Sequence, residues 1–324
     1  MSVMKDFLLS YDDVYLRPKH SFLISRSDAD TSVEFLGKRW KLPVIPANMQ
    51  DVISVENAKY LSENDYFYIY HRFGTSAYDN TNLNVVYFIK KTNEENWKLI
   101  SISVGVGKDS IIALKTIHAL GLRVDFITID VAHSDHENVR DVIKYIKDNL
   151  PQTKLIVGNI ATSEGYKYLC DLGVDSVKIG IGGGKICTTK HKTGFHIPTF
   201  QSVLECSSLG LDVPIIADGG IKYNGDIVKA LVSGADMVMC GGLFASCIDS
   251  PAKIVNGKKI YRGSTSYESK GEHRHIEGIT LELEEGFTYE ERLQEIKEDL
   301  SSAVSYAGGN NLSAFKSVEW GIVR

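Results

Sequence analysis

The chain has 324 residues, of which 43% are hydrophobic and 24% are charged, and its formal net charge is -5. It can bury a large core, as one big barrel or as two ordinary domains, and it lacks the basic field that favours nucleic acid. No stretch approaches the ~18 apolar residues of a membrane helix, and no apolar signal core opens the chain, so we expect a cytoplasmic protein without nucleic-acid or membrane partners.

Eight short apolar runs recur along the chain, and each is continuous rather than alternating, which is typical of strands buried on both faces. The runs are 43–47, 66–70, 99–104, 125–130, 154–158, 176–180, 214–218 and 236–240. Helical patterns lie between several of them, at 110–120, 138–150, 163–172 and 224–233, and a last helix is predicted at 289–306. Three of these helices end in a glycine, at Gly121, Gly173 and Gly234.

Eight strand-helix units in one chain predict an α/β fold, a (β/α)8 TIM barrel that forms a single domain over residues 1–324. A doubly wound open sheet is the alternative, but no GxGxxG motif follows an early strand. Residues 1–42 would form an N-terminal extension. The charged segment 256–286, after the eighth strand, is too long for an ordinary loop and is predicted to be a mobile lid.

A cysteine follows three consecutive glycines after the sixth apolar run. Gly182, Gly183 and Gly184 allow a sharp backbone turn, and Cys187 lies just past that turn, with Thr189 two residues further on. One interpretation is a nucleophile loop, because a thiolate is a strong nucleophile near neutral pH. The other is a tight turn with a buried cysteine, since free cysteine usually behaves as a small hydrophobe.

The cysteine spacing predicts reduced thiols. The five cysteines are scattered without a CxxC pair, which argues against disulfides and against a zinc site. They are Cys170, Cys187, Cys206, Cys240 and Cys247.

Polar or glycine-rich residues follow each predicted strand, at the end of the barrel where active sites lie. They are Asn48, Arg72, 105–107, Asp130 with His133, Asn159, 182–189, 218–220 and 241–242. The glycine turns after the last two strands fit a phosphate site, where backbone N–H groups can point at phosphate oxygens. The residues alone therefore predict an enzyme that acts on a phosphate-bearing ligand through a cysteine, and they leave the substrate open.

Several motifs spread over nearly the whole chain resemble those of one enzyme family. They are the loop 180–189, Pro46-Ala47-Asn48-Met49-Gln50, Tyr68-Ile69-Tyr70-His71-Arg72-Phe73, Val157-Gly158-Asn159-Ile160-Ala161-Thr162, Ile216-Ala217-Asp218-Gly219-Gly220-Ile221 and Ser305-Tyr306-Ala307-Gly308-Gly309. In sequence and order they resemble the IMP dehydrogenase/GMP reductase family.

Within that family the chain is similar to the reductases. It has no room for the regulatory domain common in the dehydrogenases, and the segment after the eighth strand lacks their Arg-Tyr pair. Residues 274–278 instead resemble the reductase motif that holds an acid/base glutamate, here Glu277. The resemblance implies NADPH-dependent reductive deamination of GMP to IMP and ammonia through a cysteine thioimidate. Cys187 would attack purine C2, while Thr189 and Glu277 relay the proton.

The resemblance also implies binding residues. For the substrate, Asp218 would hold the ribose, and the remaining candidates are Gly219, Gly220, Gly241, Gly242, Arg262, Gly263, Ser264, Arg274 and Gly278. For NADPH they are Ser25, Arg26, Arg72, Asp130, Val131, Ala132, Ile181 and Gly182, with Ser302 and Ser305 completing a neighbouring subunit's site in a homotetramer. The carbonyls of Gly182, Gly184 and Cys187 resemble a loop for a monovalent cation such as K⁺.

The chain departs from the family pattern at three places. Gly183 stands where proline is usual, which predicts a looser loop. The run from Asp130 to His136 differs from the usual Asp-x-Ala-His-Gly-His, and Ile279 stands where related enzymes often have lysine.

Three alternatives remain. One is an IMP dehydrogenase that lacks its regulatory domain, and another is a non-catalytic purine-nucleotide sensor, although simple binding needs neither a cysteine nor an acid/base pair. The third is a metal enzyme that uses His133, Asp135, His136, His273 and His275.

Overall fold

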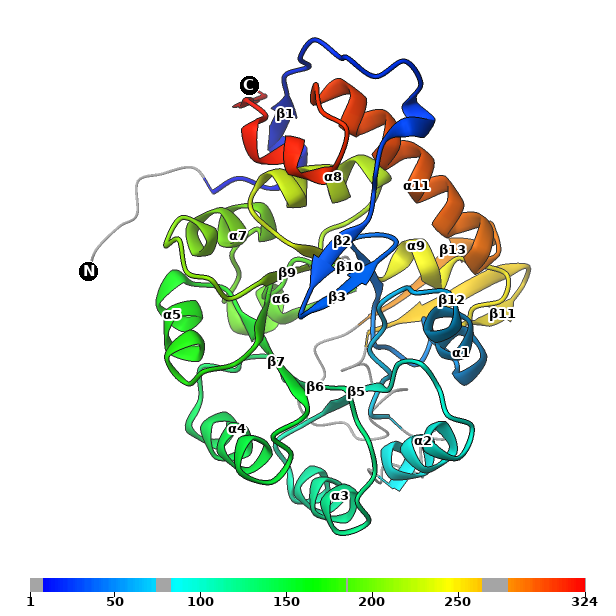
Figure 1. Cartoon of the computed structure of the whole chain (residues 1–324), viewed down its shortest axis with the longest axis vertical. Helices are drawn as coiled ribbons and strands as arrows, with labels where there is room; N and C mark the ends of the chain where they lie inside the picture. The colour runs from blue at the N-terminus through cyan, green and yellow to red at the C-terminus, as the bar shows by residue number, and fades with distance from the viewer. Residues whose placement is uncertain (1–7, 74–82, 185, 264–278, 324) are drawn as a thin grey trace.

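A curled parallel sheet forms the centre of the molecule (Figure 1). The computed structural model describes residues 8–73, 83–184, 186–263 and 279–323. Within these residues seven strands form one parallel sheet in the order β4-β10-β9-β8-β7-β6-β5. Their bounds are β4 Val44–Pro46, β5 Ser101–Val104, β6 Phe126–Asp130, β7 Lys154–Ile160, β8 Ser176–Ile179, β9 Ile215–Asp218 and β10 Met237–Cys240.

The sheet confirms seven of the eight predicted strands, and the remaining one contributes a single bridge. Tyr70 pairs in parallel with Ile102 of β5. Its amide donates to the Ser101 carbonyl over 3.0 Å, and its own carbonyl accepts from the Ser103 amide over 2.8 Å. The run 66–70 therefore lies beside β5, as predicted, but pairs over too short a length to count as a regular strand.

Helices surround the sheet (Figure 1). They are α1 Val55–Glu63, α2 Leu83–Glu94, α3 Lys108–Ala119, α4 Glu137–Asn149, α5 Ser163–Asp171, α7 Thr199–Ser207 and α8 Asn224–Val232. The predicted α3, α4, α5 and α8 are confirmed, whereas α1, α2 and α7 were not predicted. Gly121, Gly173 and Gly234 adopt positive φ angles of 60°, 71° and 112°, as left-handed residues after a helix should.

The N-terminal extension packs against the end of the chain. Strand β1 (Val14–Leu16) pairs antiparallel with β14 (Trp320–Ile322), and β2 (Val33–Phe35) forms a hairpin with β3 (Lys38–Trp40). The 3-10 turn η2 (Arg26–Asp28) lies against α11, whose bounds Tyr289–Tyr306 match the prediction. A further turn, η3 (Leu312–Ser317), precedes β14.

Two strands lie within the predicted lid segment 256–286, and a third directly precedes it. Among the described residues, β11 (Lys253–Val255), β12 (Lys258–Arg262) and β13 (Thr280–Glu284) form an antiparallel sheet that the sequence did not predict. Residues 264–278 lie outside the described residues, so the predicted mobility of 256–286 stays a prediction.

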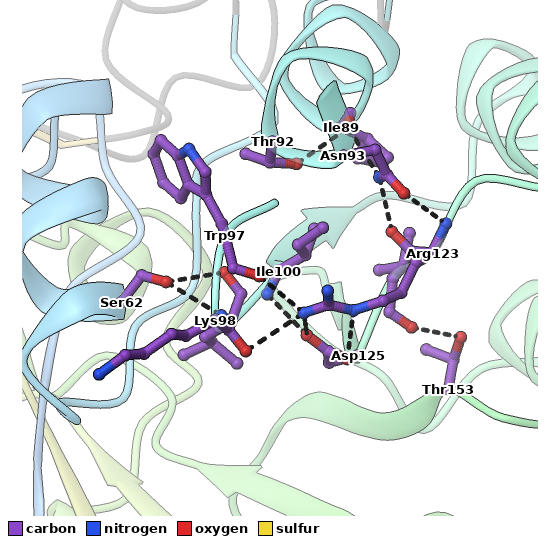
Figure 2. A network of polar contacts seen from close by, with 12 residues as sticks. Ser62, Ile89, Thr92, Asn93, Trp97, Lys98, Ile100, Arg123, Asp125 and Thr153 are labelled. Carbon is purple, nitrogen blue, oxygen red and sulfur yellow. Dashed lines mark hydrogen bonds and ion pairs between the residues drawn. The ribbon is translucent and has the colours of Figure 1, made fainter. Parts of the chain in front are cut away.

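The N-terminal end of the sheet is held by a polar network (Figure 2). Arg123 donates to the Trp97 and Lys98 carbonyls over 2.9 and 3.2 Å and to the carboxylate of Asp125 over 2.9 and 3.0 Å. Asp125 in turn accepts from the Ile100 amide over 2.8 Å. Because these contacts join segments that enter β5 and β6, they stabilise the end of the sheet opposite the expected active site.

Among the described helices, none has the length and apolar character needed to cross a membrane.

Candidate active site

A cavity of about 810 Å³ opens at the carboxyl ends of the parallel strands. Its wall includes Asn48, Arg72, Asp130, Asn159 and Asp218, each at or just beyond the end of a predicted strand. In the parallel arrangement these ends meet at one edge, which is where the polar residues were expected.

Cys187 and Thr189 lie together on the wall of this cavity. The Cys187 thiol sulfur and the Thr189 hydroxyl oxygen are 3.1 Å apart. The turn before them depends on Gly180, whose φ is 148° and where an added Cβ would lie 1.8 Å from the Asp218 carbonyl oxygen. The position of Cys187 excludes the alternative of a buried structural cysteine.

The remaining thiols are kept protonated by their surroundings. Burial raises the pKa of Cys206 and of Cys247 to about 12, and it raises the pKa of Cys170 and Cys240 as well. Because a thiol is a poor nucleophile until it ionises, Cys187 is the cysteine best suited to covalent chemistry.

A cradle of backbone atoms lies at another part of the cavity wall. Gly219 and Gly220 have positive φ angles of 98° and 90°, and Gly241 precedes the short helix α9 (Gly242–Ala245). An added Cβ at Gly241 would lie 2.1 Å from the Tyr261 hydroxyl oxygen, whereas at Gly242 it would meet nothing within 4 Å. The first N–H groups of a helix lack intrahelical acceptors, so this open backbone fits a phosphate group.

Arg72 borders the cavity on the side of Asp130. Burial lowers the pKa of Arg72, while the nearby Asp130 acts in the opposite direction. Its Nε atom is buried and has no hydrogen-bond partner among the described residues. Val131, Ala132, Ile181 and Gly182 line the same cavity. A guanidinium on the wall of an open cavity fits an anionic or polar cofactor group.

The structure does not bring every predicted residue to this cavity. Ser25, Arg26, Ser302 and Ser305 form a separate cluster on the surface, where Arg26 donates to the Ser302 hydroxyl over 3.3 Å. There the hydroxyl oxygens of Ser21 and Ser305 are 2.9 Å apart. None of the four predicted residues lines the part of the cavity wall that is described.

Arg262, a predicted substrate residue, pairs with a carboxylate beside the cavity. Its backbone amide and its Nε atom both donate to the Asp51 carboxylate over 2.8 Å, and its Nη2 atom also contacts that carboxylate. Of the two predicted neighbours, Gly263 lines the cavity and Arg262 does not. Through Asp51 the guanidinium therefore anchors β12 to the loop after β4.

Ser264, Arg274, Glu277 and Gly278 lie outside the described residues. The residues that flank them are nevertheless fixed beside the cysteine loop. The Gly263 amide donates to the Ile279 carbonyl over 3.1 Å, and the Ile279 amide donates to the Ile186 carbonyl over 3.0 Å. Ile186 directly precedes Cys187, so the residue two positions after Glu277 is hydrogen-bonded next to the candidate nucleophile.

The metal alternative gains no support from the described residues, which contain no group of three or more potential ligands. His136 instead caps α4, where its Nδ1 accepts from the Asn138 amide over 3.1 Å. His273 and His275 lie outside the described residues.

Sequence reasoning missed Lys178. This lysine is 2% exposed, and its ammonium contacts the carboxylates of Asp130 and Asp218 over 2.8 and 2.7 Å. A signal was present in the sequence, because a lysine inside an otherwise apolar buried strand requires a charged partner.

The sequence of the whole chain matches one known family. Residues 8–320 fit the sequence model of the IMP dehydrogenase / GMP reductase domain. The chain belongs to the IMP dehydrogenase/GMP reductase family. Within this family it is similar to the GMP reductase of Staphylococcus carnosus, with 43% identity over 98% of this chain and 97% of the relative. The GMP reductases of Staphylococcus epidermidis and Staphylococcus aureus are 42% and 41% identical, each over 98% of this chain and 97% of their own length.

Proposed function

We propose that this protein is a GMP reductase, which converts GMP to IMP and ammonia. One observation carries the proposal: a thiol and a hydroxyl 3.1 Å apart, Cys187 and Thr189, on the wall of a cavity that ends in an open backbone cradle. The full-length relatives that carry this name support the choice of substrate.

In this reaction Cys187 attacks C2 of the purine and forms a covalent thioimidate as the C2–N bond breaks and ammonia leaves. NADPH, when bound, supplies the hydride that replaces the sulfur at C2. Attack requires a thiolate and departure requires a protonated amine, so a proton must move locally. Thr189 is within hydrogen-bond distance of the sulfur and is proposed to relay that proton, with Glu277 as its partner. The contact between Ile279 and Ile186 supports this role for Glu277.

The two ligands are assigned to two sides of the cavity. We propose that Gly219, Gly220, Gly241 and Gly242 hold the phosphate of GMP and that Asp218 holds its ribose. Further substrate residues are proposed to be Arg262, Gly263, Ser264, Arg274 and Gly278. The residues proposed to contact NADPH are Arg72, Asp130, Val131, Ala132, Ile181 and Gly182. The position of the Arg72 cation on the cavity wall beside Asp130 supports that side for the cofactor.

We also propose how the sheet closes and how copies of the chain assemble. We infer that the parallel sheet closes into a (β/α)8 barrel between β4 and the run 66–70, which already pairs with β5. The barrel would form a single domain over 1–324. The surface cluster of Ser25, Arg26, Ser302 and Ser305 lies away from the cavity of its own chain. This position supports its assignment to the cofactor site of a neighbouring copy in a homotetramer.

A monovalent cation in the cysteine loop is the last element of the proposal. The Gly184 carbonyl already accepts from the Cys187 amide over 3.1 Å. A carbonyl oxygen has two lone pairs, so a cation would have to share it with that amide. Rates in KCl should exceed rates in tetramethylammonium chloride of equal ionic strength, and equal rates would remove the cation.

The proposed function is tested by the absorbance of NADPH. With GMP the purified protein should oxidise NADPH and release IMP and ammonia in equal amounts. IMP with NAD⁺ is the second arm, because the alternative dehydrogenase would reduce NAD⁺ and form xanthosine monophosphate. Binding of GMP without turnover in either direction would support a nucleotide sensor and contradict the proposal.

A further inference from the structure

Lys178 occupies an unusual place beneath the candidate active site. It extends from β8, and its ammonium contacts Asp130 at the end of β6 and Asp218 at the end of β9. The lysine is 3% exposed at its side chain, while the two carboxylates keep 21% and 22% of theirs exposed. The cation is therefore buried under the cavity floor, and the two anions reach that floor from either side of it.

Amide side chains complete the arrangement. Asn159 donates to the Asp218 carboxylate over 2.9 Å and to the Gly180 carbonyl over 2.6 Å, and its oxygen accepts from Lys178. Asn48 donates to the other Asp130 oxygen over 3.0 Å. Each carboxylate thus has both the lysine and an amide as partners, which is what a buried charge requires to be tolerated.

We propose that Lys178 is a positioning residue that holds Asp130 and Asp218 as one charge-paired unit, so that the cofactor side and the nucleotide side of the cavity share a single fixed floor. The assignment of the two sides rests on the proposed function. The charge-paired unit itself does not, because it follows from contacts among the protein's own residues.

The balance of charge supports this unit. Burial alone would lower the pKa of Lys178, but Asp130 and Asp218 outweigh burial and hold that pKa above its usual range. Burial alone would raise the pKa of Asp130, but Lys178, together with Arg72 and Asn48, outweighs burial and holds that pKa below its usual range. Without the lysine, the burial that remains should raise the pKa of Asp130.

Among the described residues, few other groups near the unit change charge between pH 5 and pH 8. Arg72 faces Asp130 and stays a cation in this range. Tyr11, Cys240 and Tyr261 face Asp218, and burial raises the pKa of each well above neutrality, so they stay neutral. A pH effect that appears on removal of Lys178 can therefore be assigned to the carboxylates.

The first test measures thermal unfolding of the ligand-free protein. In wild type, Asp130 should contribute little to any change in Tm between pH 8 and pH 5, because it stays ionised while its pKa is low. Lys178→Met should unfold at a lower temperature at pH 8, since an unpaired carboxylate remains, and should regain stability as pH falls and that carboxylate takes up a proton. The difference in Tm from wild type should shrink by about half or more between pH 8 and pH 5.

Lys259→Met is the matched control. Lys259 is also 2% exposed, but its ammonium is held by the carbonyl oxygens of Ile248, Ser250 and Ala252. Its loss should lower Tm by a similar amount at both pH values, because carbonyls do not titrate. An equal pH dependence in the two variants would contradict the proposal.

The second test uses the variant pair Lys178→Met and Lys178→Met/Asp130→Asn. Asp130→Asn should lower Tm in the wild-type background and raise it in the Lys178→Met background, because there it removes an unpaired charge. If Lys178→Met is insoluble, recovery of soluble protein in the double variant supports the proposal, and continued insolubility contradicts it.

The third test concerns ligands. Lys178→Met should raise KM for both GMP and NADPH, whereas Asp218→Asn should act mainly on GMP and Asp130→Asn mainly on NADPH. An effect of Lys178→Met on one ligand alone would overturn the shared floor. If wild type does not oxidise NADPH with GMP, the proposed function fails, and the unfolding experiments still decide whether the charge-paired unit exists.

Discussion

At the scale of single residues, the reactivity of the site depends on Cys187. We expect Cys187→Ala to reduce kcat by about 10³-fold or more, because no other group can form the covalent intermediate, while GMP still binds. Calorimetry and the NADPH assay measure the two effects. Cys206→Ala is the control, since that thiol is buried and its pKa is raised to about 12. Turnover of Cys187→Ala within tenfold of wild type would contradict its role.

Thr189 allows a separate test of proton transfer. Thr189→Ala and Glu277→Gln should each reduce kcat by roughly 10²–10⁴-fold, the range for a positioned proton-transfer group. If the two act as one relay, the double variant should be little slower than the slower single variant. Losses that multiply would show two independent roles.

Thr199 leaves no room for a side chain at Gly183. An added Cβ at Gly183 would lie 2.3 Å from the Thr199 hydroxyl oxygen, and Thr199 is 3% exposed, so it has little room to move. Gly183→Ala should therefore cost about 1–3 kcal/mol of stability, the usual range for overpacking. Thr199→Ala should recover part of that loss in the double variant, as measured by urea unfolding. Simple addition of the two single effects would count against this contact.

At the scale of elements, the turn from β10 into α9 is proposed to hold phosphate. Gly242→Ala should leave Tm near that of wild type, because nothing lies within 4 Å of the added Cβ, and should raise KM for GMP by about tenfold or more. Gly225→Ala, which also meets nothing within 4 Å but lies in α8, should change neither quantity. An unchanged KM for Gly242→Ala would place the phosphate elsewhere.

At the scale of the whole molecule, the surface around η2 should be covered by a second copy. Phe22 and Ile24 are 83% and 101% exposed, beside the cluster of Ser25, Arg26 and Ser302. Light scattering should give the mass of a tetramer, and Ile24→Asp should reduce that mass and raise KM for NADPH. Tyr87→Asp on α2, where the side chain is 71% exposed, should leave the mass unchanged. A fully active monomer would show that no site is shared.

Much of this architecture could be predicted because its signals are local. The runs 99–104 and 125–130 are continuous and apolar, and they form β5 and β6, since strands covered on both faces need no polar alternation. The glycines at 121 and 173 mark helix ends through their own backbone freedom. Helices α1 and α7 escaped prediction, because their buried faces mix apolar side chains with polar ones, Asn57 and Ser62 in α1 and Thr199 and Ser202 in α7.

The sequence by itself determined the order of strands and helices, the glycine turns, the cysteine loop and the family, because these depend on periodicity and on neighbouring residues. Only the tertiary structure decided which side chains meet. It paired Lys178 with carboxylates from β6 and β9, it bound Arg262 to Asp51, and it brought Arg26 beside Ser302. Such contacts join residues far apart in the chain, and they exist only once the sheet has curled and set the register of its strands.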